Sequence, residues 1–294
     1  MISIVIISKD EKNLDITLAD MASQVTSVAE TCEIVVVDAS DHRLDHIRHG
    51  HETAVRWLDF KQPPGVQVTI PHQRNLGVRE ARGDIIVFTD AGCRPQPGWL
   101  ASLVAPLRLG ESVAAGVYED PSGENHYQLR PELAREGNYL EESPTLNYAF
   151  RREVFDAVGG FDENFAYGSD VDFCWRHIDL GYNILCVPGA VVAHDWGTPR
   201  RQRRRSYMYG KARARLYLKH RRRLRSILRN DPMVVVNPLF LLGLPLTLVF
   251  PLYPMLLLIP AWWYRSRGVR GAVRALVYNL WFGGGVLAGL AGRW

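Results

Sequence analysis

The stretch "IIVFTDAGCRP", residues 85–95, decides the fold because an apolar run in it ends on a single carboxylate. Ile, Val and Phe bounded by Gly-Asp before and by Gly and Pro after are typical of a strand covered on both faces, as in a parallel sheet. Open α/β sheets bind ligands just beyond the carboxyl ends of their strands, and Asp90 falls at such an end. A turn aspartate that caps the next helix is the alternative at this point.

The segments around this strand follow the order of an α/β fold. Ser3–Ile7 and Glu33–Val37 are β-branched runs, and apolar residues recur at helical spacing between them. A further strand is expected at Gly65–Ile70, followed by a helix that ends at Gly83. The pattern predicts a Rossmann-like, mostly parallel sheet with nucleotide-binding geometry.

Charge divides the chain into an acidic body and a basic tail. Residues 1–199 hold 16 Lys and Arg against 30 Asp and Glu, whereas residues 200–294 hold 19 against the single acid Asp231. The four cysteines form no C-x-x-C pair, which favours reduced thiols in a cytosolic compartment and implies no zinc site. The apolar run at the N-terminus is shorter than a signal-peptide core, so we interpret it as the first strand and expect no export of the body.

The tail has the composition of a membrane-attached segment. Residues 200–231 carry 14 basic residues and predict a basic amphipathic helix. Met233–Tyr264 contains no charged residue over 32 positions and is broken by prolines, and residues 272–292 are nearly as apolar. A turn at Pro251 would keep both basic segments on the cytoplasmic side, so we expect a short or re-entrant hairpin, with 272–292 as a further span or an interfacial helix. The predicted organisation is therefore 1–199 as the body, 200–231 as a juxtamembrane helix and 232–294 as membrane-associated segments.

Five motifs in the body occur in a recognisable order: "SIVIISKDE", "EIVVVDAS", "HQRNLGVREARGDIIVFTDAGCRP", "LNYAFRREVFDAVGGFDENFAYGSDVDFCWR" and "VVAH". Together they resemble glycosyltransferase family 2, whose members are inverting enzymes of the GT-A fold. The resemblance covers roughly residues 1–200 and extends to membrane-bound members in the tail. It implies a GT-A catalytic domain and a nucleotide-sugar donor, a UDP- or GDP-sugar.

The resemblance implies a nucleotide-binding role for several residues. The family holds the nucleoside at the ends of its first two strands, where hydroxyl and carboxylate groups accept from base and ribose. Turn chemistry is the alternative for Asp38, and a solvated surface position is the alternative for Arg74. In the family, the arginine that matches Arg74 points toward the base and the following asparagine orders the loop. The residues implied in sugar-donor binding are Ser8, Glu11, Asp38, Arg74, Asn75, Asp90 and Arg205.

The same resemblance implies a divalent cation, Mg²⁺ or Mn²⁺, on an Asp-x-Asp signature. Here the signature is Asp90-Ala91-Gly92, so the second carboxylate is missing. Mg²⁺ often uses only one or two carboxylates together with substrate phosphates and water. His194 falls where metal-dependent members often have a histidine ligand, and a structural histidine is the alternative. We therefore expect the cation on Asp90 and His194.

The catalytic base implied by the resemblance is Asp170, because inversion needs a carboxylate that takes the acceptor hydroxyl's proton. Ser169 stands where the family has Glu, and Ser169-x-x-Asp172 also has the form of a capping box. The two interpretations are compatible, since residues two apart on a helix lie on different faces. The expected acceptor-side residues are Asn147, Asp162 and Arg176.

The function expected from these observations is a non-processive hexosyltransferase at the cell membrane with its catalytic domain in the cytoplasm. Processive members carry Gln-x-x-Arg-Trp, whereas Gln202-x-x-Arg205 is followed here by Ser206. The expected partners are a lipid-linked or glycan acceptor and membrane lipids, without nucleic acid. A membrane-anchored nucleic-acid-binding protein is the first alternative, but the acidic body would repel phosphates. A nucleotidyltransferase is the second, and "SKDEK" lacks its Gly-rich loop.

Overall fold

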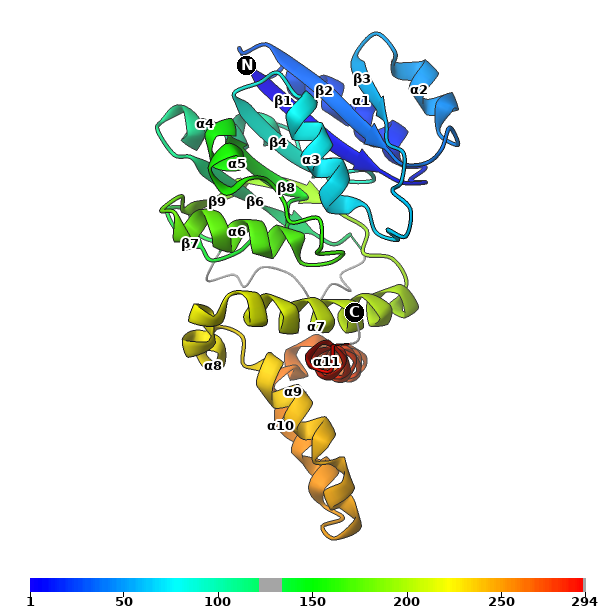
Figure 1. Ribbon diagram of the computed structural model, residues 1–294, viewed down its shortest axis with the longest axis vertical. Coiled ribbons are helices and arrows are strands. Elements are labelled where there is room, and N and C mark those ends of the chain that lie inside the picture. The colour runs from blue at the N-terminus through cyan, green and yellow to red at the C-terminus, as the bar shows by residue number, and fades with distance from the viewer. Residues whose placement is uncertain (122–133, 293–294) are drawn as a thin grey trace. The chain divides into compact units, whose positions relative to one another are not determined.

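The computed structural model describes residues 1–121 and 134–292 and contains two compact units, Met1–Asp195 and Trp196–Trp294. The first unit is an α/β domain and the second is helical (Figure 1). In chain order the first unit contains β1 (Ile2–Ser8), α1 (Leu14–Val25), β2 (Cys32–Asp38), α2 (Asp45–His51), β3 (Val55–Asp59), α3 (Ile70–Glu80), β4 (Ile85–Asp90), β5 (Arg94–Pro95), α4 (Trp99–Arg108), β6 (Val113–Glu119), β7 (Tyr139–Leu140), β8 (Asn147–Arg151), α5 (Arg152–Val158), α6 (Ser169–Asp179) and β9 (Ile184–Ala193).

These strands form one sheet in the order β3-β2-β1-β4-β8-β6-β9-β5, with β7 paired to β9. The strands from β3 to β4 are parallel, β8 is antiparallel to both of its neighbours, and β6 and β9 are again parallel. The sheet is thus more mixed than expected, because β8 runs back between two strands of the opposite direction. The parallel part is the part in which the sequence predicts nucleotide-binding geometry.

Burial on both faces explains the apolar runs that predict the central strands. All seven residues of β1 are buried. One face packs Val5, Val37 and Phe88 with aromatic residues that include Phe150 of β8 and Phe173 of α6. Figure 1 shows α3, α5 and α6 over the nearer face of this sheet. The strand expected at Gly65–Ile70 is wrong, because this segment is a loop that leads into α3.

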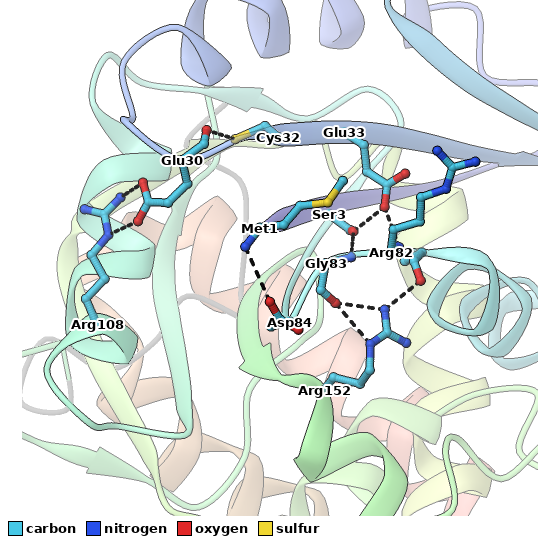
Figure 2. Close-up of polar contacts among 11 residues, drawn as sticks. Met1, Ser3, Glu30, Cys32, Glu33, Arg82, Gly83, Asp84, Arg108 and Arg152 are labelled. Carbon is cyan, nitrogen blue, oxygen red and sulfur yellow. Dashed lines mark hydrogen bonds and ion pairs between the residues drawn. The ribbon is translucent and has the colours of Figure 1, made fainter.

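Polar contacts tie the strands together at the edge where β1 and β4 begin (Figure 2). The Ser3 hydroxyl donates to the Glu33 carboxylate and accepts from the Gly83 amide at 2.7 Å. The Arg152 guanidinium donates to the Gly83 carbonyl at 3.0 Å and also to that of Ala81. These bonds fix the starts of the strands, whereas Ser8, Asp38 and Asp90 lie at the opposite ends of their strands.

The second unit contains α7 (Pro199–Lys219), η1 (Arg221–Ser226), α8 (Ile227–Asn230), α9 (Met233–Leu242), η2 (Leu244–Leu248), η3 (Tyr253–Leu257), α10 (Leu258–Trp263), η4 (Arg265–Arg267) and α11 (Gly268–Leu290). The single basic helix expected over 200–231 is therefore wrong beyond Lys219. Helices α7 and α11 cross at small residues: a Cβ atom at Gly210 would collide with the Phe282 carbonyl, and one at Gly285 with the Tyr207 carbonyl. Glycine is required at both positions by this close approach of two backbones.

The apolar segment after α8 reverses at the predicted proline break. The ring of Tyr253 stacks on Phe240 with centroids 5.3 Å apart, and its hydroxyl donates to the Phe240 carbonyl at 3.0 Å. Figure 1 shows the resulting hairpin of α9 and α10. Its large apolar side chains are exposed, among them Leu248 and Val249 at 88% each. Within the described part of the chain, one helical stretch, Arg265–Leu290, is long and apolar enough to cross a membrane.

Candidate active site

Three parallel strands end side by side and bring their terminal polar residues together. Ser8 of β1 pairs in register with Asp38 of β2, and Ile7 pairs with Asp90 of β4. Asp38 is buried and accepts from the Ser40 hydroxyl at 2.5 Å and from the Ser40 amide at 3.1 Å. Burial raises the pKa of Asp38, and the Ser40 hydrogen bonds oppose that rise. Asp38 therefore makes the turn contact that was the alternative to nucleotide binding. It also lies at a strand end, beside Ser8, as expected.

Helix α3 holds the strand ends from the side. Gln73 donates from Nε2 to the carbonyls of Ser8 (2.9 Å) and Val37 (3.0 Å), a link that the sequence does not predict. Arg74 is 5% exposed, its Nη2 lies 3.4 Å from Asp90 Oδ1, and its guanidinium faces the rings of Phe88 and Phe161. Among the described residues, Arg74 Nε and Ser8 Oγ are buried without a hydrogen-bond partner. Two orphaned polar atoms at one edge of a sheet indicate a place for a polar ligand.

Asn75 ties the helix to the turn before α6. Its Nδ2 donates to the Phe161 carbonyl and to Glu163 Oε1, both at 2.9 Å, and its Oδ1 accepts from the Phe161 amide at 2.8 Å. Gly160 allows this approach because it has a φ of +81° and a Cβ atom there would lie 2.8 Å from Asn75 Oδ1. In the same turn, Asp162 Oδ1 accepts from the amide and the side chain of Asn164, both at 2.9 Å.

Asp170 lies in the first turn of α6, behind a left-handed Gly168. Its carboxylate is half-buried and accepts from the Val171 amide at 2.9 Å. Burial raises the pKa of Asp170, and the positive charge of Arg74 opposes the rise. Arg74 thus contacts the strand-end acid Asp90 and acts electrostatically on the expected base. A raised pKa suits a carboxylate that has to accept a proton.

The capping box expected at Ser169-x-x-Asp172 is wrong, because the helix begins at Ser169 and the residue at its N-cap is Gly168. Asp172 is fully buried and binds Arg176 Nε through Oδ2 at 2.8 Å. The other nitrogens of Arg176 donate to the carbonyls of Val158 and Gly160, both at 2.6 Å. All the guanidinium nitrogens of Arg176 are therefore engaged within the domain, which fits a role in the framework on the acceptor side.

The remaining expected site residues have contacts within their own units. Asn147 is 1% exposed. Its Nδ2 donates to the carbonyls of Val117 and Ala190, and its Oδ1 accepts from Trp99 Nε1. Arg205, in the second unit, donates from Nη1 to the Trp196 carbonyl at 3.2 Å. Asn147 is a core residue that joins three elements.

Sequence reasoning missed two residues near Asp170. The negative charges of Glu142 and Asp170 both raise the pKa of Tyr118, after the larger effect of its burial, and Glu142 also raises that of Asp170. Tyr118 is the penultimate residue of β6, and Glu142 follows β7. No sequence signal joins these positions to α6, because the sheet alone brings them together.

The metal expectation rests on donor chemistry at the end of β4. Among the described residues, no three His, Cys, Asp or Glu side chains are arranged to hold a metal ion. His194 Nδ1 lies 3.4 Å from Cys93 Sγ, and only the tautomer with its proton on Nδ1 leaves Nε2 able to bind a cation. The Glu11 carboxyl carbon lies 3.4 Å from the position that a Cβ atom of Gly92 would take. Asp90 and Glu11 offer the hard oxygen ligands that Mg²⁺ and Mn²⁺ prefer, so these residues fit a cation shared with substrate phosphates.

Known proteins resemble this chain over about half of its length. The Pre-mycofactocin glycosyltransferase of Mycobacterium tuberculosis is 33% identical over 162 residues, which cover 50% of this chain and 34% of that protein. Glycosyltransferase AglE of Haloferax volcanii is 23% identical over 166 residues, covering 52% of this chain and 53% of that protein. The chain spans about a third to a half of the length of these curated relatives.

A solved structure shares the fold. The mannosyltransferase PcManGT of Pyrobaculum calidifontis, in complex with GDP-Man and Mn²⁺, superposes with a TM-score of 0.69 at 17% identity and covers 100% of this chain and 88% of that one. The likeness supports the GT-A fold predicted from the motifs. Family matches agree: Glycosyl transferase family group 2 matches residues 132–278, and Glycosyl transferase family 2 matches residues 3–169, more than half of the sequence. The chain therefore belongs to glycosyl transferase family 2.

Proposed function

We propose that this chain is an inverting, non-processive hexosyltransferase that moves a sugar from a UDP- or GDP-sugar to an acceptor hydroxyl on a lipid-linked or glycan acceptor. The observation that carries the proposal is the position of Arg74. It contacts Asp90 at the end of β4, and its positive charge lowers the pKa of Asp170 in α6. The guanidinium group of Arg74 thus connects Asp90, which is suited to the phosphate side of the sugar donor, with Asp170, which is suited to proton transfer. The curated relatives named as glycosyltransferases support the same reaction class.

In the proposed mechanism, Asp170 accepts the proton of the acceptor hydroxyl as its oxygen attacks the anomeric carbon. The bond from that carbon to the diphosphate breaks with its electron pair, and the nucleoside diphosphate leaves. Arg74 stabilises the charge that develops on it. Ser8, Asp38 and Asn75 hold the nucleoside and its loop. A Mg²⁺ or Mn²⁺ ion, when bound through Asp90 and His194, supplies further charge neutralisation to the leaving diphosphate.

The reaction class is tested by incubating the full chain with a panel of UDP-, GDP- and other nucleotide sugars and measuring release of the nucleoside diphosphate. We expect release from one UDP- or GDP-sugar, faster with acceptor present. Failure to turn over or bind any nucleotide sugar would contradict the proposal.

Removal of divalent cations is expected to abolish transfer. The incubation is repeated in excess EDTA and then with Mg²⁺ or Mn²⁺ restored, and we expect activity to return only with the metal. The Asp90→Asn variant is expected to need more metal for half-maximal rate, since it loses a charged oxygen ligand. Full activity in EDTA would contradict metal dependence and would leave Arg74 as the group that neutralises the diphosphate.

We further propose that residues 1–199 form the catalytic domain on the cytoplasmic side, joined through the juxtamembrane segment 200–231 to membrane-associated segments in 232–294. The ten residues of α9 rise only about 15 Å, which is half of a bilayer's hydrocarbon core. The exposed hairpin is thus suited to enter one side of a bilayer and return. The arginines of η1 and η4 would then face anionic headgroups, each contributing about 1 kcal/mol.

Cysteine labelling in intact cells tests this topology. Cysteines are placed singly at Arg267 and at Leu109, which are both exposed, in a background where the natural cysteines are buried or half-buried. We expect both to react with a membrane-impermeant reagent only after permeabilisation. Reaction at position 267 but not at 109 in intact cells would reveal a single crossing.

A further inference from the structure

The signature Asp90-Ala91-Gly92 lacks a second acid, but the carboxylate of Glu11 lies next to the position that this acid would take. Gly92 has a φ of +89°, and its amide donates to Thr17 Oγ1 at 3.0 Å. A Cβ atom at Gly92 would lie 3.4 Å from Glu11 Cδ and 3.7 Å from Glu11 Oε1. An aspartate side chain at position 92 would therefore begin in contact with a carboxylate that is already there. Its backbone would also be strained in this left-handed conformation.

The loop between β1 and α1 fixes Glu11 at this point. The Glu11 carbonyl accepts from the Leu14 amide at 3.1 Å, and its Oε1 accepts from the Asn13 amide at 3.1 Å. Within the described residues, no hydrogen bond is formed by Oε2 of this half-buried side chain. One carboxylate oxygen is thus anchored to the backbone, while the second is available to a ligand.

Asp90 and Glu11 flank the same small region. Cys93 closes the turn that carries Asp90 and Gly92, because its amide donates to the Asp90 carbonyl at 3.1 Å. Asp90 reaches the region from the end of β4, and Glu11 reaches it from the loop after β1, the strand next to β4 in the sheet. Two carboxylates from adjacent strand ends match the number that Mg²⁺ and Mn²⁺ commonly take from a protein when phosphates supply other ligands.

We propose that Glu11 is the second carboxylate ligand of the divalent cation, in place of the acid that Gly92 lacks. The inference rests on the proposed metal-dependent reaction and reassigns Glu11 from the nucleoside to the cation. Ser8 and Asp38, at the ends of β1 and β2, remain for the nucleoside. The sequence compensates for Gly92 with a longer acidic side chain from a neighbouring loop.

Mn²⁺ binding tests the assignment without relying on turnover. The full chain is titrated with Mn²⁺, alone and with UDP or GDP, and free Mn²⁺ is followed by electron paramagnetic resonance. In the Glu11→Gln variant the amide oxygen can still accept from the Asn13 amide, so only the charge is lost. We expect its Kd for Mn²⁺ to be at least about tenfold higher than that of the wild type. Losing even a supporting group of a metal site typically weakens metal binding by about tenfold or more.

The matched control is Asp10→Asn. Asp10 is the adjacent acid, its carboxylate pairs with Arg43 at 2.7 Å, and its φ of +59° is a conformation that Asn tolerates. We expect this variant to keep the wild-type Mn²⁺ affinity. We also expect Glu11→Gln to bind UDP or GDP in EDTA as the wild type does.

Three outcomes would overturn the inference. Equal Mn²⁺ affinity of wild type and Glu11→Gln would remove Glu11 from the ligand set while leaving the proposed reaction intact. Weaker nucleotide binding by Glu11→Gln in EDTA, to the same extent as with Mn²⁺, would return Glu11 to the nucleoside. No Mn²⁺ binding by the wild-type chain with either nucleotide would overturn the inference together with the metal dependence of the proposed function.

Discussion

The Asp170→Asn variant is expected to have a kcat that is about 10²- to 10⁴-fold lower than that of the wild type, because this is the usual contribution of a general base. The asparagine side chain has nearly the same shape as the aspartate. Its oxygen can still accept from the backbone amide of Val171, as the carboxylate oxygen does in the wild type at 2.9 Å. Affinity for the nucleoside diphosphate is expected to stay near the wild-type value, because the sugar-donor contacts are assigned to other elements. The measurement is kcat together with the Kd of UDP or GDP.

Asp172→Asn is the matched control for this variant. Asp172 is fully buried and paired with Arg176, and loss of one partner of a buried pair costs about 3 kcal/mol of unfolding free energy. We expect a lower Tm and a kcat per folded molecule close to that of the wild type. Near-normal turnover of Asp170→Asn, or a kcat loss in Asp172→Asn as large as that in Asp170→Asn, would show that the base is assigned wrongly.

Arg74→Gln is expected to lower kcat/KM by about 10² or more, the range for removing one stabilising group from a developing oxyanion. It is also expected to change the pH dependence of kcat. The base has to be deprotonated, so activity falls as the pH drops through its pKa. The positive charge of Arg74 lowers the pKa of Asp170, and its removal should therefore move the acid limb of the kcat profile to higher pH.

The opposite shift is expected for Glu142→Gln, because the negative charge of Glu142 raises the pKa of Asp170. The groups that act on or around this carboxylate are Arg74 of α3, Glu142 after β7, Tyr118 of β6, Tyr148 of β8 and Cys174 of α6. A purely structural effect would lower activity without moving the limb. Acid limbs that stay in place in both variants would contradict the electrostatic coupling of Arg74 and Glu142 to Asp170.

The central strands could be predicted because they are buried on both faces. The runs at β1, β2 and β4 are continuous and apolar, and the sequence places each within two residues of its observed bounds. The edge strand β3 was missed, since "VRWLD" is only half-buried and alternates with charge. The Gly65–Ile70 run has a strand-like composition, but its last residue already belongs to α3.

The positions of the candidate site residues could be predicted only as far as single motifs reach, and their roles stay predictions. Asp90 and Asp38 follow apolar runs, and Asn75 does order the 160–163 turn through hydrogen bonds to Phe161 and Glu163. The coupling of Glu142 to Asp170 and the approach of Glu11 to Gly92 join segments far apart in the sequence, and no local pattern encodes them. The capping box failed because a left-handed Gly168 already begins the helix.

The anomeric configuration of the product tests the central claim most directly. With the nucleotide sugar identified in the panel, the first-formed product is followed by ¹H NMR, in which the anomeric coupling distinguishes the two configurations. Direct displacement with Asp170 as base predicts a product whose anomeric configuration is opposite to that of the sugar donor. Retention of the donor's configuration in the first-formed product would contradict the account.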